Sequence, residues 1–349
     1  MLELTGVIDS NLSPVIYASG FSIWKKPIVR RFFAGSNVVF VRSASQVPPD
    51  KTLAVWGCRP ILGKLHDGIQ LLHLEDGFLR SVGLGADLIR PLSWVIDTRG
   101  IYYDATRPSD LEVLLQTNTF TSDLIARAFR IRTRIVSTGL TKYNVGNTGW
   151  QRPGGTRQVI LVPGQVESDA SLLFGAPGIR TNLGLLRAVR EANPDAYVVY
   201  KPHPDVLARL KAKGEDEDDV VEWCDEVIKN VSMGELLPMV DEVHVLTSLA
   251  GFEALLRGKA VTCYGQPFYA GWGLTEDFLP VSRRTRILTL DQLVAGALIL
   301  YPSYVSYTTD KFSSPEQALD DLLAWRENSP SGMPQWSKGL RRVLIKAIS

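Results

Sequence analysis

The segment YVVYKPHPDV, residues 197–206, places a histidine between two prolines directly after an apolar run. The run is rich in aromatic and β-branched residues, which indicates a strand. Pro202 and Pro204 cannot donate backbone hydrogen bonds, so they end the ladder. His203 is therefore expected on a stiff elbow at the carboxyl end of a strand, where open α/β sheets bind ligands. As an imidazolium beside Lys201, it could balance the charge on a departing phosphate.

A second candidate anion site lies in LTSLAGFEALL, residues 246–256. Thr247 and Ser248 stand at the start of a predicted helix, where unpaired amides and the helix dipole favour a phosphate. Simple N-capping, without any ligand, is the alternative role of these residues. Glu253 is a candidate acceptor of hydrogen bonds from ribose hydroxyls, or else an ordinary surface residue of the helix.

Carboxylates follow a third apolar run, in PGQVESDAS, residues 163–171. Glu167 and Asp169 come just after the predicted strand end, and Gln165 precedes them. A carboxylate at this place could act as a nucleophile or as a general base. The alternative is a helix N-cap formed by Ser168 or Asp169.

The first half of the chain offers a comparable pair in LLHLEDGFLRS, residues 71–81. Glu75 and Asp76 end the apolar run there, and an ordinary Asp-Gly turn is the alternative. Two carboxylates contributed by facing lobes are what retaining chemistry at a sugar carbon requires. One of them attacks the carbon, and the other exchanges a proton with the acceptor.

The composition argues against several classes of protein. A length of 349 residues, with 45% apolar and 21% charged residues, is typical of a soluble protein of two domains. A net charge of +1 without a long basic run argues against nucleic-acid binding. Cys58, Cys224 and Cys263 lack the spacing of a zinc site or a disulfide framework. No apolar stretch approaches the ~20 residues of a membrane span, and no signal-peptide pattern opens the chain, so a cytoplasmic location is expected.

The elements that must position these residues follow an α/β pattern. Residues 144–158 concentrate glycine and asparagine around one proline, which indicates a linker between two lobes. Strand and helix patterns alternate after it, which predicts a parallel, Rossmann-like sheet with helices on both faces. We expect an N-terminal lobe over 1–150, a C-terminal lobe over 151–305, and helices over 306–349 that pack back on the N-terminal lobe.

Two helices can be bounded from the sequence. The first is predicted over residues 122–137 and is closed by Gly139. The second is opened by Ser314 as its N-cap. Beyond it, residues 333–349 mix basic and apolar residues at helical spacing. This tail is suited to an anionic membrane surface, or equally to docking on the protein with a solvated basic face.

Five segments stand out by their length and unusual composition: AVWGCRP, LEDGFLRSVGLGADLIRPLSWVIDTRGIYYDATRPSDLE, KYN, KPHPDV and VLTSLAGFEALLRGKAVTCYGQPFYAGWGLTED. They resemble the KpsC family of capsular polysaccharide proteins. The resemblance implies a GT-B fold, in which an acceptor-binding lobe and a donor-binding lobe enclose a cleft.

The activity implied by this resemblance is transfer of 3-deoxy-D-manno-oct-2-ulosonic acid (Kdo) from CMP-β-Kdo. The acceptor would be a Kdo-capped lysophosphatidylglycerol, and the product the poly-β-Kdo linker of a capsule. The protein would then lie peripherally on the inner membrane of a Gram-negative bacterium, beside other capsule biosynthesis enzymes. Full-length members carry two modules, and residues 162–206 look more like the C-terminal one, which implies a β-(2→7) linkage.

The resemblance also implies roles for individual residues. Asp169 matches the essential carboxylate proposed as nucleophile in a double displacement, and Glu75 is the expected acid/base. His203 is also expected to act in catalysis. The expected donor-binding residues are Gln165, Lys201, His203, Thr247, Ser248 and Glu253, and those of the acceptor or Kdo pocket are Asp76, Arg80, Tyr269 and Trp272.

No cofactor is expected. A histidine, a lysine and a helix N-terminus could stabilise a departing nucleotide without a metal ion. Two rival functions stay open at this point. A CDP-glycerol-type polymer phosphotransferase would need no carboxylate nucleophile, and a non-catalytic scaffold would bind nucleotide or lipid-linked glycan without turnover.

Overall fold

The computed structural model describes residues 13–83, 89–144, 146, 149–155 and 158–328. They form two compact units. The first unit contains the described residues up to Ile101, the short stretch Pro108–Leu111 and the residues from Ala295 onward. The second contains Tyr102–Arg107 and Glu112–Val294. The boundary expected near residue 150 thus lies inside the second unit, and the basic tail at 333–349 lies outside the described residues.

The first unit is built on a seven-stranded sheet in the order β13-β12-β5-β4-β3-β1-β2. Strands β1 to β4 are joined by parallel pairing, whereas β5, β12 and β13 are added antiparallel. The interior strand β3 is buried on both faces, which explains its continuous apolar run. The strands are β1 (Val15–Ser19), β2 (Asn37–Phe40), β3 (Thr52–Trp56), β4 (Gln70–Asp76), β5 (Ser93–Asp97), β12 (Pro302–Val305) and β13 (Phe312–Ser313).

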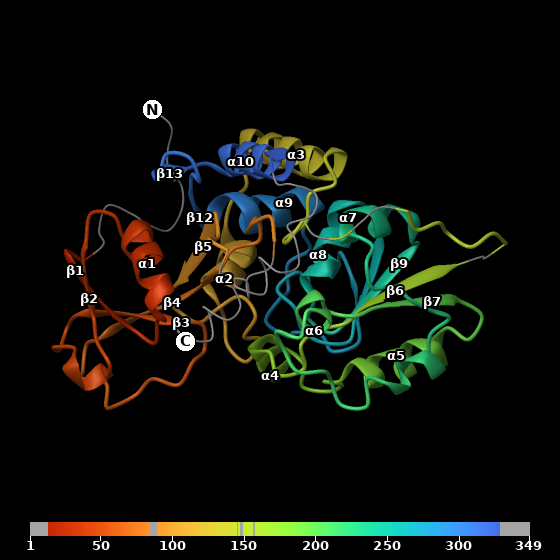
Figure 1. Cartoon of the computed structure of the whole chain (residues 1–349). Coiled ribbons are helices and arrows are strands. Elements are labelled where there is room, and N and C mark those ends of the chain that lie inside the picture. Colours follow the sequence, from red (N-terminus) through yellow and green to blue (C-terminus); the bar gives the residue numbers. More distant parts are fainter. Residues whose placement is uncertain (1–12, 84–88, 145, 147–148, 156–157, 329–349) are drawn as a thin grey trace. The chain divides into compact units, whose positions relative to one another are not determined.

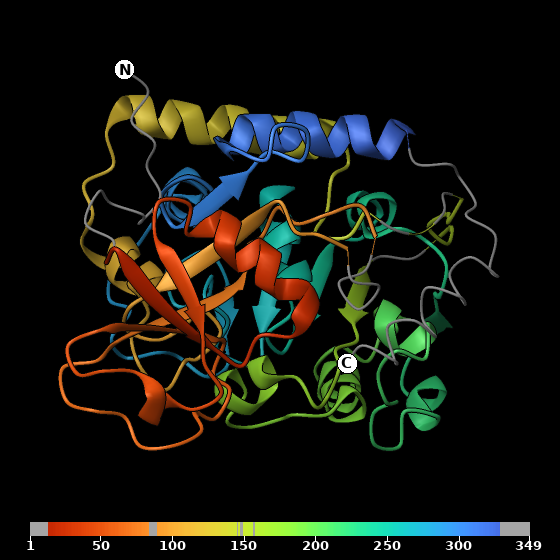
Figure 2. The same ribbon diagram turned by 60° about the vertical axis from the view of Figure 1, so that its left-hand side comes forward.

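The helix α1 (Lys26–Phe32) lies across this sheet, where it appears as the red helix of Figure 2. Phe32 stacks on Trp94 with ring centroids 4.7 Å apart. Trp56 packs edge-on against Trp94 at 5.3 Å. These aromatic contacts lie in an apolar core cluster of the first unit.

The second unit contains a six-stranded sheet in the order β11-β10-β9-β6-β7-β8, in which every pair is parallel. Helix α5 lies on one side of it, and α7 and α8 lie on the other (Figure 1). Its strands are β6 (Val159–Pro163), β7 (Tyr197–Lys201), β8 (Glu226–Val227), β9 (Glu242–Val245), β10 (Ala260–Cys263) and β11 (Glu276–Asp277). The helices named here and below are α2 (Asp110–Thr117), α4 (Ala170–Gly175), α5 (Asn182–Ala192), α6 (Pro204–Leu207), α7 (Met233–Leu236), α8 (Leu249–Leu256) and α9 (Leu290–Val294). The predicted alternation of strand and helix is confirmed.

Both bounded helices are also confirmed. Helix α3 spans Ser122–Ser137, and Gly139 follows it with a φ of 64°, the left-handed conformation that favours glycine. Helix α10 spans Pro315–Asn328, and the Oγ of Ser314 accepts from the Gln317 amide at 3.3 Å. Among the described residues, no helix combines the length and the apolar content needed to cross a bilayer.

The strand order of the second sheet indicates where a ligand would bind. Strand β6 pairs with β7 on one side and with β9, which comes later in the chain, on the other. The sheet therefore changes its direction of growth between β6 and β9. In open α/β sheets the carboxyl ends of strands at such a switch point border the crevice that binds ligands.

Candidate functional site

Gln165 links the loops that follow β6 and β9. Its Nε2 donates to Thr247 Oγ1 at 3.0 Å, and its Oε1 accepts from the Thr247 amide at 2.9 Å. On the other side, Asn182 at the start of α5 accepts from the Gln165 amide at 2.8 Å and donates to the Gln165 carbonyl at 2.9 Å. Thr247 therefore engages both polar atoms of the Gln165 side chain, which fixes the two loops across the switch point. No sequence pattern pointed to Asn182.

The two carboxylates after β6 have different surroundings. Glu167 accepts from the amides of Asn182 at 2.7 Å and Glu215 at 2.8 Å, one through each oxygen, so it braces two loops. Asp169 is exposed and caps α4, since its Oδ1 accepts from the Ser171 amide at 3.2 Å. Capping engages one oxygen of Asp169. Of the two candidates, Asp169 is the more exposed, and one of its oxygens has no role in the cap.

His203 caps the short helix α6, and its Nδ1 accepts from the Asp205 amide at 3.1 Å. The proton of the neutral ring therefore lies on Nε2. Burial lowers the pKa of His203 from 6.5 to about 4; the charge of Lys142 lowers this pKa further, and that of Asp169 opposes the shift. The expected imidazolium is thus wrong for the free protein near neutral pH. Burial also lowers the pKa of Lys201, at the end of β7.

The free energy of unfolding should depend on this partly buried imidazole in a predictable direction. The folded pKa lies below 6.5, so the unfolded state binds more protons between pH 6.5 and about 4. The stability that the neutral ring contributes is complete above pH 6.5 and is lost as the pH falls toward 4. When the pH falls from 7 to 5, we expect the free energy of unfolding of the wild type to decrease by roughly 1–2 kcal/mol more than that of His203→Asn. The asparagine side chain can still cap α6 but does not titrate.

Urea unfolding at the two pH values measures this difference. His203→Gln is the matched control, because it removes the cap as well as the titration. It should cost about 1 kcal/mol at both pH values without the extra pH dependence. The same loss on acidification in the wild type and in His203→Asn would contradict the lowered pKa.

Glu253 connects α8 to a segment that had no assigned role. Only 8% of Glu253 is exposed, and burial raises the pKa of its carboxyl group. Its Oε1 accepts from the Lys142 amide at 2.6 Å, and Arg257, one turn later, donates to the Leu140 carbonyl at 2.9 Å. The alternative of a surface residue is therefore wrong for Glu253. The side chain anchors Lys142, whose charge acts on His203 and whose only sequence signal was the KYN motif.

The start of α8 is fixed by a cap and by a tyrosine. Ser248 Oγ accepts from the Ala250 amide at 3.3 Å, so N-capping is present, and the Ser248 carbonyl accepts from the Tyr269 hydroxyl. A Cβ atom on Gly251 would lie 2.3 Å from the Tyr269 hydroxyl oxygen, which explains the glycine. Tyr269 and Trp272 are fully buried. Tyr269 also stacks on Phe252 of α8, whereas Trp272 Nε1 donates to the Phe268 carbonyl at 2.8 Å. Both side chains thus support the structure around this loop, whereas the sequence predicts that they shape a pocket.

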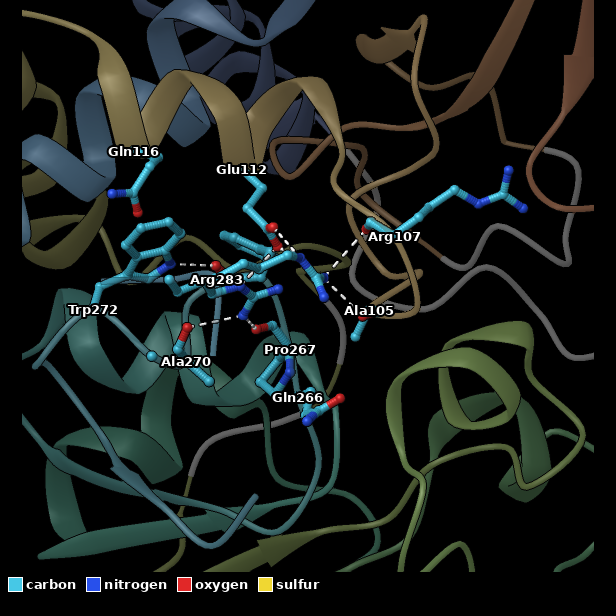
Figure 3. A network of polar contacts seen from close by, with 12 residues as sticks. Ala105, Arg107, Glu112, Gln116, Gln266, Pro267, Ala270, Trp272 and Arg283 are labelled. Atoms are coloured by element: carbon cyan, nitrogen blue, oxygen red, sulfur yellow. Dashed lines mark hydrogen bonds and ion pairs between the residues drawn. The ribbon is translucent and has the colours of Figure 1, made fainter. Parts of the chain in front are cut away.

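The loop at residues 264–273 is held by the network of polar contacts in Figure 3. Glu112, in α2, accepts from Arg283 and, at 2.9 Å, from Arg284. Arg284 donates in turn to two carbonyls of the loop at 2.6 and 2.8 Å, and Arg283 donates to the Ala105 carbonyl at 2.7 Å. Glu112 and Arg284 are buried and stand 172 positions apart, so no local pattern could have paired them.

In the first unit, Glu75 and Asp76 end β4 as expected. Asp76, however, is paired with Arg80. Asp76 accepts from Arg80 Nε at 2.6 Å and from Trp94 Nε1 at 3.2 Å. Only 2% of Arg80 is exposed. Asp76 and Arg80 therefore form a largely buried ion pair that supports the strand end next to Glu75.

Lys25 also belongs to this region, although no sequence motif predicted a role for it. Its Nζ lies 2.8 Å from the ring centroid of Trp56. Burial lowers the pKa of Lys25 from 10.5 to about 8, and the nearby charges of Asp76 and Glu75 oppose the shift. Lys25 therefore places a positive charge near the two carboxylates that end β4.

Comparison with known proteins gives consistent matches over most of the chain. Residues 64–312 match the family described as "Capsule polysaccharide biosynthesis protein". The capsule polysaccharide modification protein LipA of Neisseria meningitidis serogroup A is 43% identical over 90% of this chain and 46% of its own length. The lipopolysaccharide-processing protein LpsZ of Rhizobium meliloti is 41% identical over 91% of this chain and 76% of its own length. This chain therefore spans about half the length of LipA.

Two solved structures are similar over nearly their full length. The β Kdo 2,7 transferase of Thermosulfurimonas dismutans KpsC is 41% identical, with a TM-score of 0.73 over 88% of this chain and 98% of that one. The β Kdo 2,4 transferase of the same KpsC is 34% identical, with a TM-score of 0.77 over 88% and 97%.

Proposed function

This chain belongs to the family of capsule polysaccharide biosynthesis proteins, and from this membership we propose that it is a retaining β-Kdo glycosyltransferase. The membership confirms the resemblance found in the sequence. CMP-β-Kdo would be the donor, and a Kdo-terminated glycolipid of the capsular linker the acceptor. One observation carries the proposal: an exposed carboxylate, a neutral imidazole, a lysine and a capped helix N-terminus all follow neighbouring strands at the switch point of the second sheet.

The donor phosphate is proposed to lie at the carboxyl ends of β7 and β9. There, the Nε2–H of His203, the ammonium group of Lys201 and the amides at the start of α8 could stabilise the departing CMP. Lys142, anchored through its amide by Glu253, would add a positive charge to the same region. Because these groups can carry the phosphate charge, we propose that transfer needs no metal ion.

Transfer would occur in two displacements at the anomeric carbon. In the first, an Asp169 oxygen attacks C2 of Kdo while the bond from C2 to the phosphate oxygen breaks, which releases CMP and leaves a glycosyl ester. In the second, an acceptor hydroxyl gives its proton to Glu75 and attacks C2, and the ester bond breaks. Two inversions retain the β configuration.

We propose a β-(2→7) linkage, because identity is higher to the 2,7 transferase of KpsC, at 41%, than to the 2,4 transferase, at 34%. The backbone alone superposes slightly better on the 2,4 transferase. Linkage depends on side chains around the acceptor hydroxyl more than on the path of the backbone, so identity is the stronger guide.

The acceptor also suggests where the protein works. A Kdo-capped lysophosphatidylglycerol is held in a membrane, so we propose a peripheral position on the inner membrane of a Gram-negative bacterium, with other capsule enzymes nearby. The relatives from Neisseria meningitidis and Rhizobium meliloti support this setting.

Product analysis tests the proposal. CMP-Kdo hydrolyses readily, so it should be generated in place and supplied with a synthetic Kdo-capped lipid. We expect mass spectrometry to show the addition of Kdo and NMR to show a β-ketoside at the 7-hydroxyl. No transfer, or an α-configured product, would contradict the proposal. EDTA should leave the rate unchanged, and a loss of turnover that Mg²⁺ restores would contradict metal independence.

A further inference from the structure

A cavity of about 510 Å³ lies at the carboxyl ends of β1, β2 and β3 in the first unit. This volume falls within the range of small-molecule sites, about 300–1,000 Å³. The strand order is again that of a switch point, because the chain continues from β1 to β2 on one side and reaches β3 on the other. The cavity thus occupies in the first sheet the place that the candidate donor site occupies in the second.

The wall of this cavity is strongly basic. Lys26, Arg42 and Arg59 line it, and its described lining includes no acidic residue. In the part of the chain that the structure describes, no carboxylate forms an ion pair with any of the three. Arg59 donates to the Gly20 carbonyl at 3.3 Å, which holds its guanidinium beside the end of β1. Three uncompensated positive charges around a concavity attract an anion.

The rest of the wall is apolar and aromatic. Phe21, Phe40 and Trp56 line the cavity, and the Phe21 ring meets Trp56 edge-on at 6.1 Å. The Lys26 ammonium group lies 5.0 Å from the Phe40 ring centroid, so cation and ring occur side by side. A small inorganic anion would use only the charges. A sugar acid would use both features, because its carboxylate meets the cations while the C–H face of its ring packs on the aromatic side chains.

We propose that this cavity binds a carboxylated sugar of the acceptor glycan, an inference that rests on the proposed transferase function. Trp56 connects it to the proposed acid/base, because Trp56 lines the cavity and carries Lys25 on its ring. Lys25 in turn lies close enough to Glu75 for their charges to interact. The 2-ulosonic acid at the end of the acceptor would thus be held next to the strand end that carries Glu75.

The double variant Arg42→Ala/Arg59→Ala tests the cavity directly. Both arginines are exposed, so the variant should fold with a wild-type unfolding midpoint. Titration calorimetry with the methyl β-ketoside of Kdo should show affinity reduced about tenfold or more. Affinity for CMP, the probe of the donor site, should stay within about twofold. In turnover, the acceptor KM should rise while the KM for CMP-Kdo stays unchanged.

Lys51→Ala is the matched control, since this exposed lysine lies just before β3, at the opposite end of the same strand. It should bind the ketoside like the wild type. Glycerol phosphate is the second ligand arm, because a lipid phosphate is the other anion that the acceptor offers. Unchanged ketoside binding by the double variant, or arginine-dependent binding of glycerol phosphate without ketoside binding, would overturn the site.

The two proposals fail in different ways. If Kdo transfer is normal and the acceptor KM is the same in the wild type and in Arg42→Ala/Arg59→Ala, only the cavity site is overturned. Arginine-dependent ketoside binding in a protein that transfers no Kdo would overturn the proposed function and keep the binding site.

Discussion

Replacing Asp169 by asparagine should abolish Kdo transfer and leave the fold intact. Asparagine caps helices as well as aspartate does, so the contact with the Ser171 amide at the start of α4 can be kept. The amide oxygen, however, is a poor nucleophile toward a ketose carbon. We expect kcat to fall by at least about 10³-fold, while the affinity for CMP and the unfolding midpoint stay close to those of the wild type.

Two further variants sharpen this test. Asp195→Asn changes an exposed carboxylate in the turn before β7 and should keep full activity. Asp169→Ala removes both the nucleophile and the cap, so it should be inactive and modestly less stable. Full activity in Asp169→Ala would exclude the double displacement and favour the phosphotransferase chemistry of the CDP-glycerol type.

Replacing Glu112 by glutamine should produce the largest loss of stability. The side chain keeps its shape but loses the charge that faces Arg283 and Arg284, and the latter is only 2% exposed. Removing one partner of a buried ion pair leaves charge without compensation in a poor solvent. We expect the free energy of unfolding to fall by about 3–5 kcal/mol, as measured by urea denaturation.

Asp218→Asn is the control for this prediction. Asp218 pairs with Lys213 at the surface, where 87% and 50% of the two side chains are exposed, so the change should cost at most ~1 kcal/mol. Because the Glu112 network holds the loop that supports Ser248 through Tyr269, the KM for CMP-Kdo should rise as well. A cost below 1 kcal/mol in Glu112→Gln would show that the network is not a stabilising element.

Much of the candidate site could be predicted because its signals are local. An apolar run that stops at proline or polar residues marks a strand end, and parallel strands bring their carboxyl ends to one edge of a sheet. The sequence alone therefore predicts that His203, Thr247 and Asp169 lie at the same edge. The helices over 122–137 and from Ser314 were equally readable, since caps and terminal glycines act within a single turn.

Contacts between distant positions were beyond such reasoning. Glu253 reads as a surface residue or a ribose ligand in its own helix, and its burial against the Lys142 amide involves a segment 111 positions away. The His203 ring reads as a cation, and it is neutral because folding removes water from it. Gln165 reads as a donor ligand, and its pairing with Thr247 depends on β6 and β9 being neighbours.

By itself, the sequence determined the strand ends, the helix caps and the family, because the signal for each lies within a short run of neighbouring residues. Only the tertiary structure shows which polar groups make supporting contacts and where the two units divide. It alone also shows the basic cavity at the carboxyl ends of β1 to β3. The physical reason is that burial and long-range pairing set the charge and the partners of a side chain, and neither is a property of its neighbours along the chain.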